Sequence, residues 1–127
     1  AGWRFAAADT VADFALHGRL FVGPCVPATR FDRARVAAEL AAVDVVLSCD
    51  GRDVDEGRAD IVLDGPVHAL KLWVDAMAAQ PQRWPIVAGD IVTTGTITDA
   101  APLHSGERWQ TRLSDSRLAG MELVTRS

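Results

Sequence analysis

Hydrophobic side chains recur at helical spacing after Asp64-Gly65-Pro66, and this pattern predicts a helix that ends near Gln80. Pro66 suits the first turn, where a missing backbone N–H leaves no hydrogen bond unmade. Four residues form the apolar face of this helix: Val67, Leu70, Val74 and Met77. A shorter helix is predicted from Asp9 to His17, with Asp9 as its N-terminal cap.

Runs rich in β-branched residues predict short strands. Asp50-Gly51 is typical of a type I′ hairpin turn, so we predict a strand from Ala41 to Cys49 and a return strand from Arg52 to about Arg58. The stretch 36–47 is ambiguous, because its alanines favour a helix and its valines favour a strand. Residues 24–35 are predicted to form a loop. Four further strands are predicted: Arg19–Gly23, Ile91–Thr94, Arg108–Leu113 and Met121–Thr125.

These elements predict an α+β, strand-dominated fold with two helices. The chain has 127 residues, of which 49% are hydrophobic and 24% charged, which is typical of a globular domain and not of a disordered chain. The absence of a repeat or a low-complexity linker in the sequence predicts a single domain over 1–127. The chain starts at Ala1-Gly2 without an initiator Met, so we expect a processed or partial polypeptide.

Charge and cysteine content narrow the possible partners. The net charge is −4, and the arginines are interleaved with acidic residues, which argues against a nucleic-acid binder. No apolar run reaches the roughly 18 residues that a membrane span requires, so we expect no membrane partner. Cys25 and Cys49 lack the spacing of a metal site or a disulfide scaffold, which predicts reduced thiols in a cytoplasmic protein.

Two groups of residues are candidate cation sites. Six acidic residues lie in or near the predicted hairpin: Asp50, Asp53, Asp55, Glu56, Asp60 and Asp64. Hard cations bind several carboxylates, but the spacing is not that of an EF-hand and arginines are interspersed, so a solvated hairpin is the preferred interpretation. His17, His68 and His104 are far apart in sequence, and we expect separate histidines in preference to a zinc site.

The threonine-rich stretch 91–98 is the best candidate for ligand binding. Along a strand, alternate side chains face opposite ways, so Thr94, Thr96 and Thr98 are predicted on one side, with Gly95 allowing close backbone approach. A row of hydroxyls beside free backbone N–H groups suits a small carboxylate or keto acid. The alternative is that threonine is present here only for its strand propensity.

Three stretches, taken in order, resemble the fumarylacetoacetate hydrolase superfamily. The segment 88–98, followed by Ala101-Pro102 and Ser105-Gly106-Glu107, is similar to the C-terminal signature of its 2-keto-4-pentenoate hydratase and 4-oxalocrotonate decarboxylase branch. The helix that starts at Asp64-Gly65-Pro66, with its Trp73, resembles a helix of that branch. Trp3-Arg4-Phe5 and the stretch 9–13 resemble an upstream segment. The resemblance covers almost the whole chain and implies a C-terminal portion with mixed, rolled and packed β-sheets.

The resemblance also implies a function. Members of this family bind Mg²⁺ or Mn²⁺ through an E-x-E pair and a third acidic residue, and the metal chelates a 2-keto acid. The family positions of these ligands, and of a catalytic Lys, lie upstream of Ala1, so no metal, cofactor or catalytic residue is expected in this chain alone. Lys71 does not match the family's Lys. Phe14 and Leu16 stand where the family has Asn and Ser.

The favoured hypothesis is a metal-dependent lyase, a hydratase or decarboxylase of a short 2-keto acid such as 2-keto-4-pentenoate from aromatic-compound catabolism. We expect Thr96 first, then Thr94 and Thr98, to contact substrate, with Asp13 as a further candidate. The expected partners are the 2-keto acid and either further copies in a homo-oligomer or a complementary N-terminal half. The alternatives are a non-catalytic half-domain that binds a small acid or a partner chain, and a C–C bond hydrolase of the same superfamily.

Overall fold

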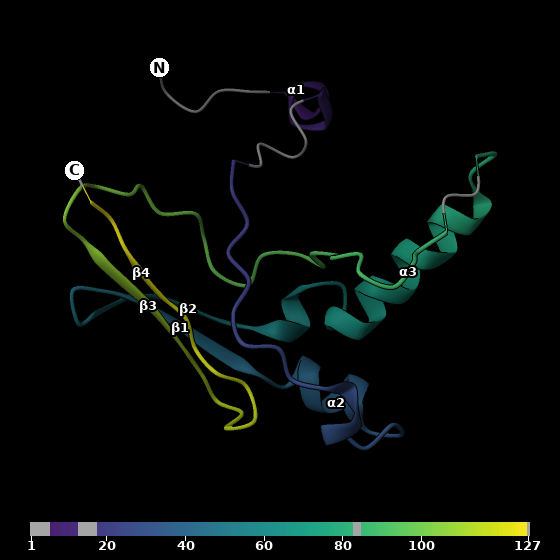
Figure 1. The fold of residues 1–127 in the computed structure, drawn as a ribbon, viewed down its shortest axis with the longest axis horizontal. Coiled ribbons are helices and arrows are strands. Elements are labelled where there is room, and N and C mark those ends of the chain that lie inside the picture. The colour runs from purple at the N-terminus through teal and green to yellow at the C-terminus, as the bar shows by residue number, and fades with distance from the viewer. Residues whose placement is uncertain (1–5, 13–17, 83–84, 127) are drawn as a thin grey trace.

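The computed structural model describes residues 6–12, 18–82 and 85–126 (Figure 1). The element order is α1 (Ala7–Ala12), the 3-10 helix η2 (Ala28–Arg30), α2 (Val36–Ala41), β1 (Asp44–Cys49), β2 (Arg52–Arg58), the 3-10 helix η3 (Ala59–Ile61), α3 (Pro66–Ala79), β3 (Arg108–Leu113) and β4 (Glu122–Val124). The predicted α+β class is confirmed. Within the described residues there are three α-helices, where the sequence predicted two.

The four strands form one antiparallel sheet in the order β2-β1-β3-β4. The hairpin between β1 and β2 turns at Asp50 and Gly51, whose φ angles of 49° and 77° confirm the predicted turn. The pairing of β1 with β2 shifts between Leu47 and Ser48, where β2 has one extra residue. Strands β2 and β3 have the predicted bounds, and β4 lies within its predicted range.

Because successive side chains along each strand point to opposite faces, this sheet has one apolar face and one charged face. Val45, Leu47 and Cys49 of β1 pair with Leu113, Thr111 and Trp109 of β3, and together they form the apolar face. The intervening positions form ion pairs on the other face, where Arg112 binds Asp53 at 2.8 Å and Arg108 binds Glu122 at 2.7 Å. The core lies at one end of the apolar face, where Leu40, Ile97, Leu113 and Leu118 pack on Val43, Val45 and Ala59.

The ambiguous stretch 36–47 forms both of the structures that its composition favours. The alanine-rich half is α2, and the valine-rich half is β1, which starts at Asp44 and not at the predicted Ala41. Helix α3 is confirmed, with Gly65 at its N-cap and Pro66 at its start. Gly65 has a φ of 122°, and a β-carbon there would lie 2.7 Å from that of Ala41, so only glycine lets α3 approach α2 this closely.

Three further predictions of local structure were wrong. Arg19–Gly23 and Ile91–Thr94 form no strand. Phe21 and Val22 remain more than half exposed, at 56% and 57%, and strand propensity without a pairing partner does not make a strand. Asp9 lies in the first turn of α1, where its carboxylate accepts a hydrogen bond from the Ala6 N–H at 2.8 Å, and is therefore not the cap. The predicted end of this helix falls outside the described residues.

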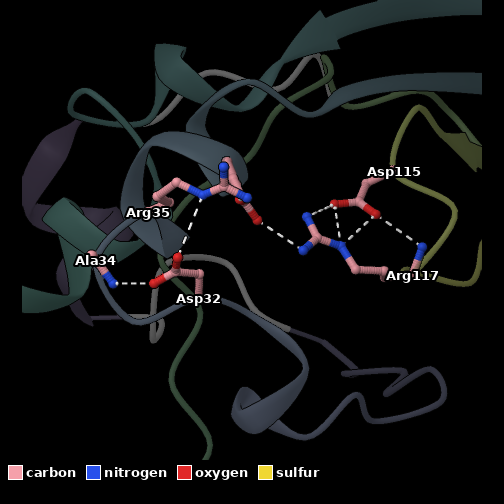
Figure 2. Close-up of polar contacts among 6 residues, drawn as sticks. Asp32, Ala34, Arg35, Asp115 and Arg117 are labelled. Carbon is pink, nitrogen blue, oxygen red and sulfur yellow. Dashed lines mark hydrogen bonds and ion pairs between the residues drawn. The ribbon is translucent and has the colours of Figure 1, made fainter.

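An ionic chain joins α2 to the loop between β3 and β4 (Figure 2). Arg35 lies 3.6 Å from Asp32 and 2.9 Å from Glu39, and Arg117 lies 2.8 Å from the other oxygen of Glu39. Arg117 also donates to Asp115 from its side chain and its backbone, and its guanidinium lies 4.3 Å from the centre of the Phe31 ring. The Arg117 side chain, then its backbone N–H, holds the pKa of the Asp115 carboxyl below its usual range.

Candidate functional site

The threonine-rich segment runs beside β2 in an extended but irregular course. Gly95 has a φ of 143°, and a β-carbon there would lie 2.6 Å from Val62, so Gly95 lies directly against that side chain. Ile97 packs on the core, and a β-carbon at Gly57 would lie 2.2 Å from the Ile97 carbonyl oxygen. The Asp99 N–H donates to the Asp55 carboxylate at 2.7 Å. Three alternate positions of the segment are therefore fixed by contacts with β2 and Val62.

The three predicted threonines alternate with these anchors in sequence, since Thr94 precedes Gly95 and Thr96 and Thr98 lie between anchored residues. Thr96 is exposed, and Thr94 and Thr98 are half-buried. Among the described residues, no hydrogen bond is made by any of the three hydroxyls, although side-chain hydrogen bonds are common in the neighbouring loops. The segment thus lacks the predicted strand, and the placement of the three threonines on one side stays a prediction. Its hydroxyls have donor and acceptor capacity left for a ligand, and substrate contact remains a prediction. Asp13 lies outside the described residues.

None of these threonines lines the groove on the apolar face of the sheet. That groove, of about 480 Å³, lies near β3 and β4. Thr93, on the opposite alternation, lines a smaller hollow together with Trp73 and the stretch Asp90–Val92. Figure 1 shows the green segment after α3 returning along that helix before it reaches the sheet. The threonine row and the groove are therefore separate features.

The acidic residues of the hairpin are engaged with separate partners. Asp50 accepts the Arg108 N–H at 3.0 Å, and Asp53 binds the Arg112 guanidinium through both oxygens at 2.8 and 2.9 Å. Asp55 accepts two backbone N–H groups, from Glu56 and Asp99. Across the described ranges, no group of three or more His, Cys, Asp or Glu side chains has the geometry to hold a metal ion. The carboxylates of Asp50, Asp53 and Asp55 are held by the protein's own donors, so they do not fit a shared metal.

The remaining candidates for chemistry have structural partners as well. His68 Nδ1 lies 2.9 Å from the Leu63 carbonyl oxygen, and Lys71 binds Asp75 at 2.6 Å on an exposed face of α3. Burial, then the nearby charges of Asp50 and Glu107, raises the pKa of the Cys49 thiol. A thiol with a raised pKa is a poor nucleophile, because the thiolate is the reactive form.

Trp109 was not among the site residues predicted from the sequence. It is 8% exposed, forms part of the groove, and its indole N–H donates to the Glu107 carboxylate at 2.9 Å. The same carboxylate accepts the His104 N–H at 2.7 Å. The His104 backbone N–H, then the Trp109 side chain, lowers the pKa of Glu107. The alternation of Trp109, Thr111 and Leu113 was the signal in the sequence that these residues share one face.

Comparisons with known proteins give relatives of one type. Two proteins of Dechloromonas aromatica (strain RCB), 2-keto-4-pentenoate hydratase 2 and 2-keto-4-pentenoate hydratase 1, are 34% and 33% identical to this chain over 109 residues, which is 84% of it. The fold is similar to that of a 4-oxalocrotonate decarboxylase from Pseudomonas putida G7, with a TM-score of 0.56 and 27% identity over 68% of this chain. No protein-family model matches the chain.

The matches cover only part of each relative. The chain spans 38% of each hydratase and 31% of the decarboxylase. The decarboxylase was solved in complexes with calcium and acetate and with magnesium and adipate. The resemblance that the order of the sequence motifs indicated is thus confirmed in sequence and in fold.

Proposed function

We propose that this chain, a relative of the 2-keto-4-pentenoate hydratases and 4-oxalocrotonate decarboxylases, forms the C-terminal portion of a metal-dependent lyase that acts on a short 2-keto acid such as 2-keto-4-pentenoate. The observation that carries the proposal is the 34% identity to a hydratase over 109 residues, supported by the decarboxylase fold. The substrate class is that of aromatic-compound catabolism, and we propose a cytoplasmic enzyme. The described residues contain no helix with the length and apolarity that crossing a bilayer requires.

In this enzyme, the chain's own contribution is to bind substrate. The anchored positions Gly95, Ile97 and Asp99 fix the backbone, and Thr96, with Thr94 and Thr98 beside it, presents hydroxyls to the carboxylate or keto oxygen of the substrate. A hydroxyl donates one hydrogen bond and holds no proton that it transfers easily at neutral pH. These threonines therefore orient the acid and do not serve as general acids or bases. Asp13 is proposed as a further polar contact.

A divalent cation, Mg²⁺ or Mn²⁺, would stabilise the negative charge that develops on the keto oxygen. The decarboxylase structures hold magnesium or calcium, which supports a divalent metal in the whole enzyme. The hairpin carboxylates of this chain do not fit that role, because Asp53 is bound by Arg112 and Asp55 by two backbone N–H groups. We therefore propose that the metal ligands belong to polypeptide outside this chain.

Residues 1–127 are proposed to act as one domain of that enzyme. Its partner is then either further copies, in a homo-oligomer, or a complementary N-terminal half. The second possibility is supported by the coverage of the relatives, since about three fifths of each hydratase has no counterpart here.

A non-catalytic half-domain that binds a small acid is the alternative from a different class. Phe14 and Leu16, which replace the family's Asn and Ser, favour it, because they remove polar groups near the expected substrate. A C–C bond hydrolase of the same superfamily is the alternative among enzymes, since water would cleave a C–C bond of an acylpyruvate chelated in the same way.

The test uses the whole polypeptide encoded by the reading frame that contains this sequence, which we term the full-length protein. We expect it to consume 2-keto-4-pentenoate in the presence of Mg²⁺ and to lose activity with a chelator. Binding of the keto acid without consumption would favour the non-catalytic half-domain. Cleavage of an acylpyruvate without hydration would favour the hydrolase. If the full-length protein neither binds nor turns over any of these acids, the proposal is contradicted.

A further inference from the structure

The chain exposes far more surface than a free-standing domain of its size. Its accessible surface is 10041 Å². A folded monomer of 13.6 kDa is expected to expose about 6,600 Å², so the excess is about 3,400 Å². Among the described residues, six hydrophobic side chains are buried: Val43, Val45, Ala59, Val62, Ala69 and Trp109. Surface on this scale is expected to be covered by further polypeptide.

The concave part of this surface is the groove on the apolar face of the sheet. Leu47, Trp109 and Leu123 form its floor, from β1, β3 and β4. Phe21 and Leu103, each 56% exposed, and Met121, 36% exposed, form its walls. The floor is rigid, because Trp109 is tied to Glu107 and three strands are paired beneath it. The walls come from segments without regular structure. We call this feature the sheet groove.

We propose that the sheet groove receives apolar side chains from the portion of the polypeptide that the hydratases have and that this chain does not match. The proposal rests on the proposed function only in that both take the chain as part of a longer enzyme. The unmatched portion amounts to about three fifths of each hydratase, which is ample chain to cover the excess surface. The floor and walls together present six large apolar side chains, so the occupant is a predominantly apolar segment.

A second copy of this chain is the alternative occupant, and it would make protection of the groove depend on protein concentration. The unmatched three fifths of each hydratase supplies an occupant within one polypeptide at any concentration.

The experiment compares the full-length protein with the 127-residue chain by amide hydrogen exchange, without metal or substrate. We expect residues 101–103 and 121–124 to exchange at least about tenfold more slowly in the full-length protein. Leu103→Asp should remove this protection, because it places a charge in an apolar contact. Leu103→Ala, which adds no charge, should reduce it. Ile61→Asp is the matched control, since Ile61 is 72% exposed and does not line the groove, and it should leave the protection unchanged.

Three results would overturn the proposal. One is a reading frame that encodes no polypeptide beyond this chain. Another is equal exchange of these segments in both proteins, or protection that Leu103→Asp and Leu103→Ala leave intact. A third is protection in the short chain that rises with its concentration together with dimerisation in the ultracentrifuge, which would assign the groove to a second copy. If the full-length protein lacks lyase activity, these exchange results are unaffected. Failure of the proposed function is therefore distinguishable from failure of the groove assignment.

Discussion

Gly57 of β2 and Ile97 of the threonine-rich segment approach so closely that a β-carbon at Gly57 would lie 2.2 Å from the Ile97 carbonyl oxygen. Ile97 also packs on the core residues Val43 and Val45. This contact fixes the distance between the edge strand and the segment that carries the proposed substrate contacts. Only a residue without a side chain lets the two backbones lie at this distance.

Gly57→Ala is therefore expected to destabilise the fold by about 1–3 kcal/mol, which is the usual cost of forcing an extra carbon into a packed contact. Urea unfolding of the chain measures this change. Gly18→Ala is the matched control, because no atom lies within 4 Å of the corresponding position, and it should change stability little. Equal stability of the Gly57 and Gly18 variants would show that the segment is not held against β2.

The ionic chain in Figure 2 predicts how stability depends on pH. Hydrogen bonds from Arg117 lower the folded-state pKa of Asp115, so the folded protein binds fewer protons there than the unfolded one. The stabilisation is therefore present above the ordinary carboxyl pKa and is lost as the pH falls through the folded-state value. Glu107, whose pKa the His104 N–H and Trp109 lower, contributes in the same direction.

We expect Asp115→Asn to lower the unfolding midpoint at about pH 6 and to have progressively less effect below about pH 4. Thermal unfolding of both proteins over this range is the measurement. Asp75→Asn is the control, because its ion pair with Lys71 lies on the surface, with the two side chains 58% and 69% exposed. Exposed pairs of this kind contribute little to stability. A difference between wild type and Asp115→Asn that stays constant with pH would contradict the assignment.

The sequence predicted the elements whose signals are local. The Asp50-Gly51 turn, the long helix after Pro66 and the strand at Arg108 each follow from turn chemistry or side-chain periodicity within a few residues. The segments at Arg19 and Ile91 have the composition of strands but remain irregular, because strand formation depends on a partner elsewhere in the chain. Their environment is set by long-range contacts, such as Gly95 against Val62, which no local pattern specifies.

In the candidate site, too, features with a local signal were predictable from the sequence and long-range contacts were not. The close backbone approach at Gly95 was predicted from the sequence, and the resemblance to the hydratases followed from motif order. The partners of the hairpin acids were not readable. Asp53 and Arg112 are 59 positions apart, and they face each other only because β1 lies between β2 and β3. The pair stays exposed, with the Arg112 and Asp53 side chains 58% and 60% accessible, which agrees with the solvated hairpin that the sequence predicted.

Thr96→Val in the full-length protein should weaken keto-acid binding or turnover by about 1–2 kcal/mol, the scale of a lost hydrogen bond to a charged group. Stability should change little, because Thr96 is exposed and valine keeps its shape. Steady-state kinetics with 2-keto-4-pentenoate and urea unfolding are the two measurements. Thr93→Val is the matched control from the opposite alternation, and it should leave the kinetics unchanged. Unchanged kinetics in the Thr96 variant would remove the assignment of substrate contact to this row.

The 127-residue chain on its own is expected to bind Mg²⁺ or Mn²⁺ no better than a generic acidic surface and not to hydrate 2-keto-4-pentenoate. Its hairpin carboxylates are bound by Arg112 and by backbone N–H groups, so a metal ion would have to displace these donors to gather several ligands. A threonine hydroxyl is too weak a donor to replace a divalent cation at a developing enolate oxygen. Calorimetry with Mn²⁺ and a turnover assay on the purified chain test this.

Arg112→Gln is an informative variant, because it frees Asp53 without supplying a rigid site, and it should not create tight binding. Micromolar affinity together with hydration by the unmodified chain would mean that its own residues form a metal site.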